Sequence, residues 1–196
     1  MLDIITTPEE TNQKIKYLNI IQNTAQNISE EIQQIQEIDY IENGNITSNK
    51  DQIHSLNFLL DLIKKIIYQF TSKNKNIYID RLSSSQIFIS DKVLLEKAMK
   101  NLIMNALEYS PNEEEVKIGC FSENDKIKFW IKNNAIMPKE TQLQIFKKSF
   151  SSSRNHKGYG TYISKLIVEN ILNGKIYFES NQSDGTIFII ELPINV

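Results

Sequence analysis

The sequence predicts an α+β fold, a two-layer α/β sandwich of helices on one sheet, preceded by a long coiled-coil-like helix. The first observation is a run up to about Ile41 with apolar residues at heptad-like spacing and, after Pro8, neither glycine nor proline. Such a run is typical of a helix in a coiled coil or helical bundle. The second observation is that helix-like and strand-like segments then follow in mixed order and end in a hairpin through Ser183-Asp184-Gly185. This order favours a two-layer sandwich over a parallel fold of strand–helix–strand repeats.

The first helix is predicted to begin at Thr7-Pro8, a hydroxyl cap followed by a proline that suits the first helical position. The rest of its surface is polar, so a stable helix needs a partner against which it buries its apolar stripe. We expect an intermolecular bundle, and the alternative is that the helix packs only on its own domain. The stripe residues recur at alternating spacings of three and four: Leu18, Ile21, Ala25, Ile28, Ile32 and Ile35.

The chain divides into a dimerisation helix at 1–44, a polar linker at 45–54 and a globular domain at 55–196, because Asn43-Gly44-Asn45 is a strong helix-ending signal. Within the globular domain the spacing of apolar residues changes between that of helices and that of strands. The expected elements are helices at 55–70, 91–109, 139–148 and 161–172, and strands at 77–79, 87–89, 115–121, 126–132, 175–180 and 186–192.

Composition and charge exclude several classes of protein. A formal net charge of -2 offers no basic surface, so nucleic acid is not an expected partner. The single cysteine, Cys120, excludes an internal disulfide framework and is interpreted as a core residue. With only His54 and His156 beside it, a structural zinc site is not expected. No apolar run approaches the roughly 20 residues that cross a bilayer, so we expect a cytoplasmic chain, whose parent protein could still be membrane-anchored.

Two asparagines on the helix predicted at 91–109 form the first candidate site. Asn101 and Asn105 are four residues apart, so their amides lie on one face of the helix. Amide oxygens are hard ligands that suit a Mg²⁺ ion bridged to phosphates. Asparagine is also a middling helix former, and two of them within a helix invite an explanation. Taken alone, the pair is better explained as two solvated side chains.

A glycine-bearing segment, Lys157-Gly158-Tyr159-Gly160-Thr161, opens the helix predicted at 161–172. Glycines let a backbone approach a ligand closely, and the start of a helix presents free N–H groups to anions. The segment matches neither a Walker loop nor a dinucleotide fingerprint, and a plain flexible loop explains it equally well. Just before it, Phe146 and Phe150 flank a serine run, which suggests either a hinged flap or two core aromatics at helical pitch.

In this order and spacing, the segments resemble the ATP-binding domain of sensor histidine kinases, which belongs to the GHKL superfamily of ATPases. The segment from Asn101 to Ala106 resembles the N box, 145–150 resembles the F box, and 158–165 resembles the second glycine box. Asp184-Gly185-Thr186 and the strand after it resemble the closing hairpin. The resemblance covers roughly 55–193 and implies a Bergerat-type ATP-binding fold with a mixed sheet, which uses ATP and Mg²⁺.

The resemblance also implies a role for individual residues. Asn101 and Asn105 would be the catalytic amides, with Asn105 as the Mg²⁺ ligand. Thr186 would lie beneath the adenine, and Lys157 would neutralise phosphate charge. The residues expected to bind the nucleotide are Tyr109, Asn133, Met137, Phe150, Lys157, Gly158, Tyr159, Gly160, Thr161 and Thr186.

The first glycine box departs from the family pattern. The family aspartate, which accepts a hydrogen bond from the adenine amino group, is replaced by Asn133, and segment 133–138 contains no glycine. A hydrogen bond to a charged group is worth roughly 1.5–3 kcal/mol against about 1 kcal/mol for a neutral one, so we expect weaker adenine binding. The departure also motivates an alternative, a degenerate, non-catalytic scaffold or phosphotransfer and dimerisation module with weak or no ATP binding.

The function implied by the resemblance is that of the ATP-binding catalytic fragment of a two-component sensor histidine kinase. The helix at 17–44 resembles the second helix of the dimerisation and histidine-phosphotransfer hairpin, whose acceptor histidine lies upstream. No histidine precedes His54, so we expect the acceptor on a segment absent from this chain and no autophosphorylation by the fragment alone. The expected partners are a nucleotide, the receiver domain of a response regulator, and a second copy bound through the N-terminal helix. A superfamily ATPase with a glutamate base is disfavoured, because Asn101 takes that place and cannot abstract a proton.

Overall fold

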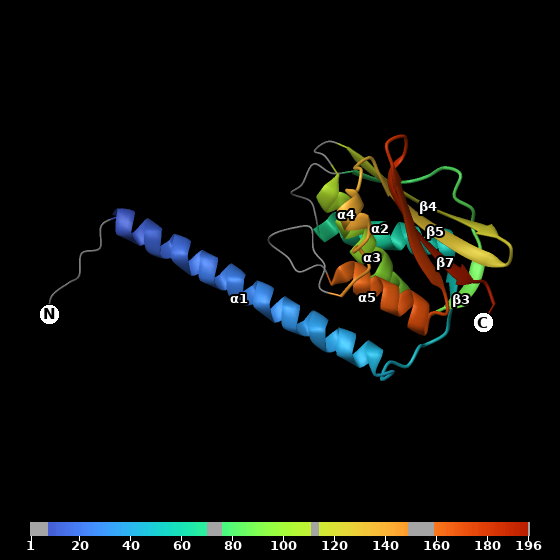
Figure 1. Ribbon diagram of the computed structural model, residues 1–196, viewed down its shortest axis with the longest axis horizontal. Helices are drawn as coiled ribbons and strands as arrows, with labels where there is room; N and C mark the ends of the chain where they lie inside the picture. Colours follow the sequence, from blue (N-terminus) through green and yellow to red (C-terminus); the bar gives the residue numbers. More distant parts are fainter. Residues whose placement is uncertain (1–7, 70–75, 111–113, 149–158, 196) are drawn as a thin grey trace.

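The computed structural model describes residues 8–69, 76–110, 114–148 and 159–195. Figure 1 shows a long helix, α1 (Pro8–Glu42), that projects from a globular body formed by the other described elements. The body combines a sheet with packed helices. The predicted α+β class and the long leading helix are therefore both confirmed.

The main sheet has five strands in the order β2-β4-β5-β7-β6. Strand β2 pairs with β4 in parallel, whereas β4 with β5, β5 with β7, and β6 with β7 are antiparallel, so the sheet is mixed. In β5, Ile127, Phe129 and Ile131 are fully buried, which is the period-two pattern of a strand with one covered face. The strand bounds are β2 Asn76–Ile79, β4 Glu115–Glu123, β5 Lys126–Asn133, β6 Lys175–Asn181 and β7 Gly185–Pro193.

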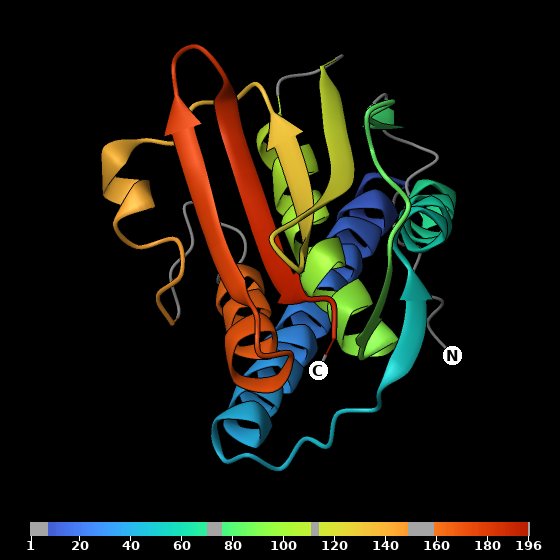
Figure 2. The same ribbon diagram turned by 90° about the vertical axis from the view of Figure 1, so that its right-hand side faces the viewer.

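Three helices cover one face of this sheet (Figure 2): α2 (Ser55–Gln69), α3 (Lys92–Tyr109) and α5 (Gly160–Leu166). The ring of Phe129 lies 5.7 Å from that of Phe58 in α2 and 5.6 Å from that of Phe88, measured between centroids. Cys120 is fully buried in the same core, as the sequence predicts, and burial raises the pKa of its thiol. The helix layer and the covered face of the sheet thus form one hydrophobic core.

The stretch predicted as a linker contains a short strand, β1 (Asp51–His54), which pairs antiparallel with β3 (Ile87–Ser90). Ile53 is the one buried residue of β1. A single buried residue produces no period-two pattern, which is why the sequence does not reveal this strand.

The helix predicted at 139–148 is wrong in length. Only α4 (Lys139–Gln142) is helical there. Beyond it the chain turns, so that the ring of Phe146 packs 5.8 Å from Phe178 and 6.2 Å from Phe188 of the last hairpin. The helical spacing of apolar residues in this segment is therefore misleading, because Phe146 packs against the sheet and not along one face of a helix.

The helix predicted at 161–172 has the right extent but is not α-helical throughout. After α5 it continues as a π-helix, η1 (Ile167–Ile171). It ends before Asn173, whose φ of 53° lies in the left-handed region that often terminates helices.

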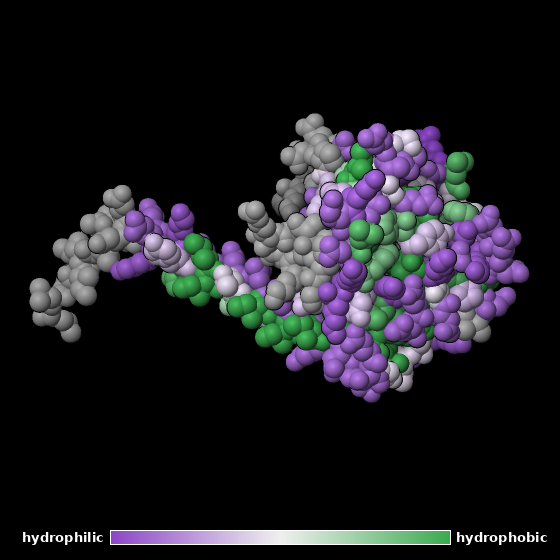
Figure 3. Space-filling view, viewed as in Figure 1, coloured by the Kyte–Doolittle hydropathy of each residue, from purple (hydrophilic) through white to green (hydrophobic). Residues whose placement is uncertain are grey.

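The apolar stripe of α1 is left uncovered by the described part of the chain. Figure 3 shows apolar side chains gathered along one side of this helix. At its C-terminal end, by contrast, Ile38 and Ile41 are buried against the globular body. Among the described residues, no helix is both long and apolar enough to cross a membrane. The stripe residues with 46 to 64% of their surface exposed are Leu18, Ile21, Ile28, Ile32 and Ile35.

Candidate functional site

Helix α3 brings the two predicted amides to the edge of the core. Asp91 caps its start by accepting a hydrogen bond from the backbone N–H of Leu94 at 2.9 Å. Asn101 and Asn105 are half-buried beside the face that packs in the core. Both amides therefore face neighbouring elements at the rim of the sandwich. The buried residues of α3 are Leu95, Ala98, Met99, Leu102, Ile103, Ala106 and Leu107.

The start of α5 lies directly against Asn101. The Asn101 Nδ2 donates to the backbone carbonyl of Gly160 at 3.2 Å. The Ser164 hydroxyl lies 2.8 Å from the same carbonyl oxygen and 3.1 Å from a backbone carbonyl of α3. On the other side, the Thr161 hydroxyl donates to the backbone carbonyl of Ile145 at 2.5 Å. The first turn of α5 is thus joined both to α3 and to the segment after α4.

A cavity of about 240 Å³ opens between α3 and the segment that follows β5. Five of the predicted site residues share it although they come from separate parts of the chain: Asn105, Tyr109, Asn133, Met137 and Thr186. Its other lining residues are Ala106, Ala135, Ile136, Pro138, Thr141, Ile145 and Phe188. A mainly apolar cavity with a few polar side chains is typical of a small-molecule site.

The amide of Asn133, at the end of β5, has a defined orientation. Asn133 is only 5% exposed, and its Nδ2 donates to the backbone carbonyl of Ala106 at 3.0 Å. That oxygen also accepts hydrogen bonds from the Ser110 N–H at 3.0 Å and the Ser110 hydroxyl at 2.7 Å. The reverse orientation would place two oxygens against each other, so Nδ2 is committed as a donor and Oδ1 remains as an acceptor. Asn133 therefore offers Oδ1, a hydrogen-bond acceptor, to any ligand that reaches it.

Two hydroxyl groups hold the cavity wall formed by residues 135–138. The Thr186 hydroxyl donates to the backbone carbonyl of Ala135 at 2.7 Å and lies 2.8 Å from the hydroxyl of Ser180. The Ser180 oxygen also accepts a hydrogen bond from the backbone N–H of Met137 at 2.9 Å. Because the Thr186 hydroxyl is engaged with Ala135, Thr186 contributes packing and wall support to the site.

The remaining predicted residues do not line the cavity. Gly160 and Thr161 lie beside Asn101 at the start of α5. The side chain of Tyr159 is buried in the core, with 5% exposed, so its backbone is the part that remains near the site. The other three predicted residues, Phe150, Lys157 and Gly158, lie outside the described residues.

Seven residues of the cavity are absent from the predicted set. Six of them belong to segments that resemble the N box, the first glycine box, the F box and the closing hairpin, so a sequence signal for them existed: Ala106, Ala135, Ile136, Pro138, Ile145 and Phe188. Thr141, in α4, carries no such signal. These residues meet in one cavity only through tertiary contacts, such as the pairing of β7 with β5.

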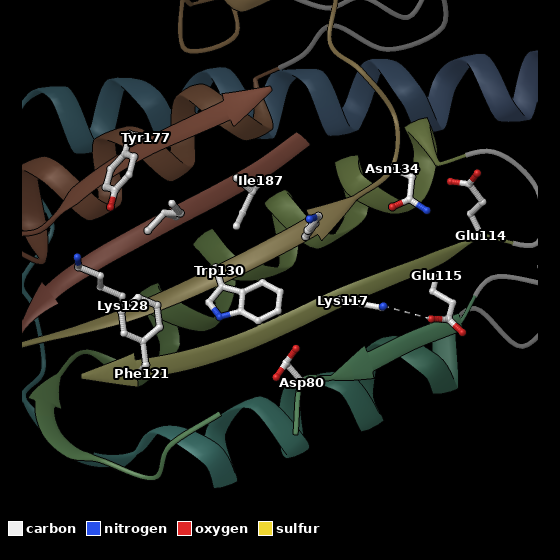
Figure 4. A pocket seen from close by; sticks show the side chains of 12 residues that line it. Asp80, Glu114, Glu115, Lys117, Phe121, Lys128, Trp130, Asn134, Tyr177 and Ile187 are labelled. Atoms are coloured by element: carbon white, nitrogen blue, oxygen red, sulfur yellow. Dashed lines mark ion pairs between the residues drawn. The ribbon is translucent and has the colours of Figure 1, made fainter. Parts of the chain in front are cut away.

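A larger groove of about 810 Å³ lies on the opposite face of the sheet, which the helices leave open (Figure 4). Its lysines are paired with nearby acids; Lys128, for example, lies 2.6 Å from Glu123. None of the predicted site residues with described coordinates lines this groove, so size alone does not identify the functional cavity. Its lining residues are Asp80, Glu114, Glu115, Lys117, Phe121, Lys128, Trp130, Lys132, Asn134, Tyr177, Ile187 and Ile189.

Trp130, the single tryptophan, lies flat on this outer face over Gly119. A Cβ atom at Gly119 would come 2.5 Å from the indole ring. We therefore predict that Gly119→Ala displaces the indole into solvent and shifts its fluorescence emission to longer wavelength. The fold should survive, because the side chain that must move lies at a surface. An unchanged emission spectrum would contradict the observed packing.

The donor set of the site restricts how it could hold a metal ion. Within the described ranges, no group of three or more His, Cys, Asp or Glu side chains is placed to hold a metal ion. A metal at Asn105 would therefore complete its coordination with water and with phosphate oxygens of a ligand, which is the usual behaviour of Mg²⁺. The mixed sheet, its three covering helices and the cavity beside Asn105 together define a Bergerat-type ATP-binding sandwich.

The family of histidine kinase-, DNA gyrase B- and HSP90-like ATPases matches residues 90–196, more than half of the chain. The chain therefore belongs to this family. Its curated relatives include the heme sensor protein HssS of Staphylococcus saprophyticus, 30% identical over 195 residues, which are 97% of this chain and 41% of that protein. The sensor protein VanS of Enterococcus faecium is 28% identical over 190 residues, which are 93% of this chain and 48% of that protein.

Solved structures of sensor kinases share the fold. The histidine kinase AdeS of Acinetobacter baumannii superposes with a TM-score of 0.75 at 19% identity, over 99% of this chain and 89% of that one. The catalytic domain of the histidine kinase ThkA superposes with a TM-score of 0.65 at 21% identity, over 76% of this chain and 99% of that one. The chain thus contains the ATP-binding domain of sensor histidine kinases and spans less than half the length of the curated relatives described above.

Proposed function

We propose that this chain is the ATP-binding catalytic part of a two-component sensor histidine kinase, which transfers the γ-phosphate of ATP to a histidine outside this chain. The observation that carries the proposal is the cavity between Asn105 and Asn133, which lies beside the junction of α3 and the start of α5. Its volume of about 240 Å³ lies below the roughly 300 Å³ at which pockets for drug-sized ligands begin. Such a cavity accommodates a nucleotide base and leaves the phosphates outside it, toward Gly160.

Asn133 supports adenine as the base. Its Nδ2 is engaged by the Ala106 carbonyl, so its Oδ1 is the atom that remains to face a ligand. The 6-amino group of adenine donates to such an oxygen, whereas the 6-oxo group of guanine would oppose it. An unpaired buried polar group costs about 1–3 kcal/mol, so the site should prefer ATP to GTP by roughly fivefold or more.

Asn105 is the residue that we propose for the metal. Its amide oxygen would complete the coordination of a Mg²⁺ ion bridged to the phosphates. A bound Mg²⁺ would offset phosphate charge during transfer. The same helix bears Asn101, whose Nδ2 donates to the Gly160 carbonyl oxygen at 3.2 Å. This hydrogen bond joins the helix that would hold the metal at Asn105 to the start of α5, where the phosphates would lie.

The acceptor histidine and the partner proteins lie outside the chain in this proposal. No histidine precedes His54, which is exposed at the end of β1. The uncovered stripe of α1 supports a homodimer, in which two copies contribute helices to one bundle. A receiver domain is the proposed phosphate acceptor after histidine, and ThkA has been solved in complex with its response regulator TrrA.

Isothermal calorimetry with a non-hydrolysable ATP analogue and Mg²⁺ tests the proposal. We expect saturable binding that weakens when Mg²⁺ is removed, and binding of the matching GTP analogue at least about fivefold weaker. Absence of binding at millimolar nucleotide, with a folded chain by circular dichroism, would instead favour a scaffold with a dead nucleotide pocket. The replacement of the family aspartate by Asn133 is the observation that favours that second candidate.

Gly160→Ala is expected to change the affinity for nucleotide without lowering the stability of the fold. A Cβ atom at Gly160 would lie 3.6 Å from Cγ of Asn101, an ordinary van der Waals distance. Alanine also suits a helix better than glycine by about 1 kcal/mol. We therefore expect unchanged or slightly higher stability in urea unfolding, together with about tenfold weaker binding of the ATP analogue, because the added methyl group obstructs close approach to the backbone. Equal affinity of variant and wild type would show that phosphates do not approach this backbone.

A further inference from the structure

The last residue of α1 contacts both sides of the segment 149–158 along the chain. Glu42 accepts a hydrogen bond from the Lys148 Nζ at 2.9 Å and another from the Tyr162 hydroxyl at 2.7 Å. Lys148 is the last described residue before that segment, and Tyr162 belongs to the first turn of α5 after it. The Glu42 carboxylate therefore connects Lys148 with the start of α5, beside which the phosphates of the nucleotide are proposed to lie.

Packing around Glu42 gives this contact a defined geometry. Ile38 and Ile41 are 0% and 4% exposed and belong to the core of the globular body. One turn earlier, Glu37 forms an ion pair with Lys97 of α3 at 2.5 Å. The end of α1 is thus held on α3 by charge and in the core by burial, so Glu42 does not depend on its own two hydrogen bonds for its position.

The electrostatics of the cluster agree with these hydrogen bonds. The hydrogen bond from Lys148, and then that from Tyr162, holds the pKa of Glu42 below its ordinary value. The hydrogen bond to Glu42, with a contribution from burial, raises the pKa of the Tyr162 phenol. The lowered pKa of Glu42 favours its charged carboxylate, and the raised pKa of Tyr162 favours its neutral phenol, which donates to that carboxylate.

We propose that Glu42 is a positioning residue for nucleotide binding, acting through Tyr162 and Lys148 on the start of α5. The inference rests on the proposed ATP-binding function. Within the first turn of α5, Thr161 is bonded to Ile145 and Gly160 to Asn101. Tyr162 adds a third anchor to the same turn, and this anchor comes from a helix outside the nucleotide-binding sandwich.

The direction of the effect follows from what is lost with the carboxylate. Without Glu42, Tyr162 loses its acceptor, and the first turn of α5 keeps one attachment fewer. Lys148 also loses its partner and gains freedom to adopt other rotamers. Both changes raise the entropy that binding must remove, so nucleotide affinity falls. By linkage, bound nucleotide strengthens the Glu42 contacts by the same factor.

The test compares the affinity of the Mg²⁺–ATP analogue for Glu42→Ala, Glu42→Gln and Tyr162→Phe with that for wild type. We expect about fivefold weaker binding for the alanine variant, the scale of a half-exposed charged contact. The glutamine variant should be intermediate, because its amide oxygen still accepts from Tyr162. Combining Glu42→Ala with Tyr162→Phe should weaken binding little beyond Glu42→Ala alone, since that change already removes the contact with Tyr162.

Glu30→Ala is the matched control. Glu30 is an exposed carboxylate on the same helix, and its hydrogen bond comes from Gln26 of that helix at 2.9 Å. We expect this variant to bind nucleotide like wild type. We also expect the Glu30 and Glu42 variants to unfold at similar urea concentrations, so that the change in affinity is not explained by a general loss of stability.

A second measurement needs no nucleotide. Tyrosine ring carbons labelled with ¹³C report the pKa of Tyr162 by NMR, and Glu42→Ala should bring that pKa down toward its ordinary value. The positioning role is overturned if the Tyr162 pKa does not move, or if wild type binds nucleotide and Glu42→Ala binds it equally well. A wild-type chain that binds no nucleotide refutes the proposed function, and the positioning role with it.

Discussion

Gly185→Ala is expected to destabilise the protein by about 4 kcal/mol, combining backbone strain with overpacking. Gly185 has a φ of 73°, in the left-handed region that disfavours residues with a Cβ atom. An added Cβ would also clash with the backbone oxygen of Asn133 and come 2.7 Å from Cα of Asn134. Because the obstructing atoms belong to backbone, no rotamer change relieves the clash. Urea unfolding followed by circular dichroism measures the loss.

Gly44→Ala provides the control for the conformational part of this effect. Gly44 has a similar φ of 69°, but a Cβ atom added there would have nothing within 4 Å, so only the backbone term remains. We expect a loss of about 1 kcal/mol there. The difference between the two losses of stability therefore measures the cost of crowding where the start of β7 approaches the end of β5. This contact lies at one wall of the cavity. Equal losses at the two positions would contradict the close approach at Gly185.

Asn133→Asp, which restores the aspartate of the family pattern, is expected to destabilise this chain at neutral pH. The Nδ2 of Asn133 donates to the Ala106 carbonyl at 3.0 Å in a position only 5% exposed. A carboxylate would place an oxygen opposite that carbonyl oxygen, with the loss of a hydrogen bond and added repulsion. We expect a cost of about 2–3 kcal/mol in urea unfolding at pH 7.

The pH dependence of this cost has a definite sign. Burial and the facing carbonyl disfavour the ionised form of the introduced carboxyl, so its pKa is higher in the folded than in the unfolded chain, where it is about 3.9. The protonated carboxyl can donate to the Ala106 carbonyl. The penalty is therefore full above the folded pKa and shrinks as pH falls toward the unfolded value. The difference between wild type and variant should narrow measurably between pH 7 and pH 5.

Asn134→Asp is the matched control, because Asn134 is the next residue and its side chain is exposed on the opposite face of the sheet. Its effect should remain within about 0.5 kcal/mol, the usual range for surface substitutions. If Asn133→Asp were as harmless as this control at pH 7, the amide orientation at Asn133 would be wrong. The preference for ATP over GTP would then lose its structural support.

Local patterns in the sequence predicted much of the fold. The spacing of apolar residues placed α1, α2 and α3 to within one or two residues of their observed bounds. The gap between the strands predicted at 115–121 and 126–132 contains the turn, where Asn124 and Asp125 adopt positive φ, 51° and 58°. These features depend on neighbours a few residues away, so a periodic pattern or a turn-forming pair is enough to identify them.

Contacts between distant segments were not predictable in the same way. The strand β1 exists because Ile53 finds a place in the core beside β3. The short α4 gives way to a turn because Phe146 packs on the last hairpin. In both cases tertiary packing, which no local pattern records, outweighs the preference of the segment itself.

Three features are readable from the residues alone: the family pattern, the pair Asn101 and Asn105 on one helical face, and the departure at Asn133. What these residues contact depends on the folded chain. The Asn133 amide donates to the Ala106 carbonyl, Asn101 donates to Gly160, and Glu42 lies against the start of α5. Elements follow from the spacing of apolar residues along the chain, whereas the hydrogen-bond partners of their polar groups depend on how the elements pack.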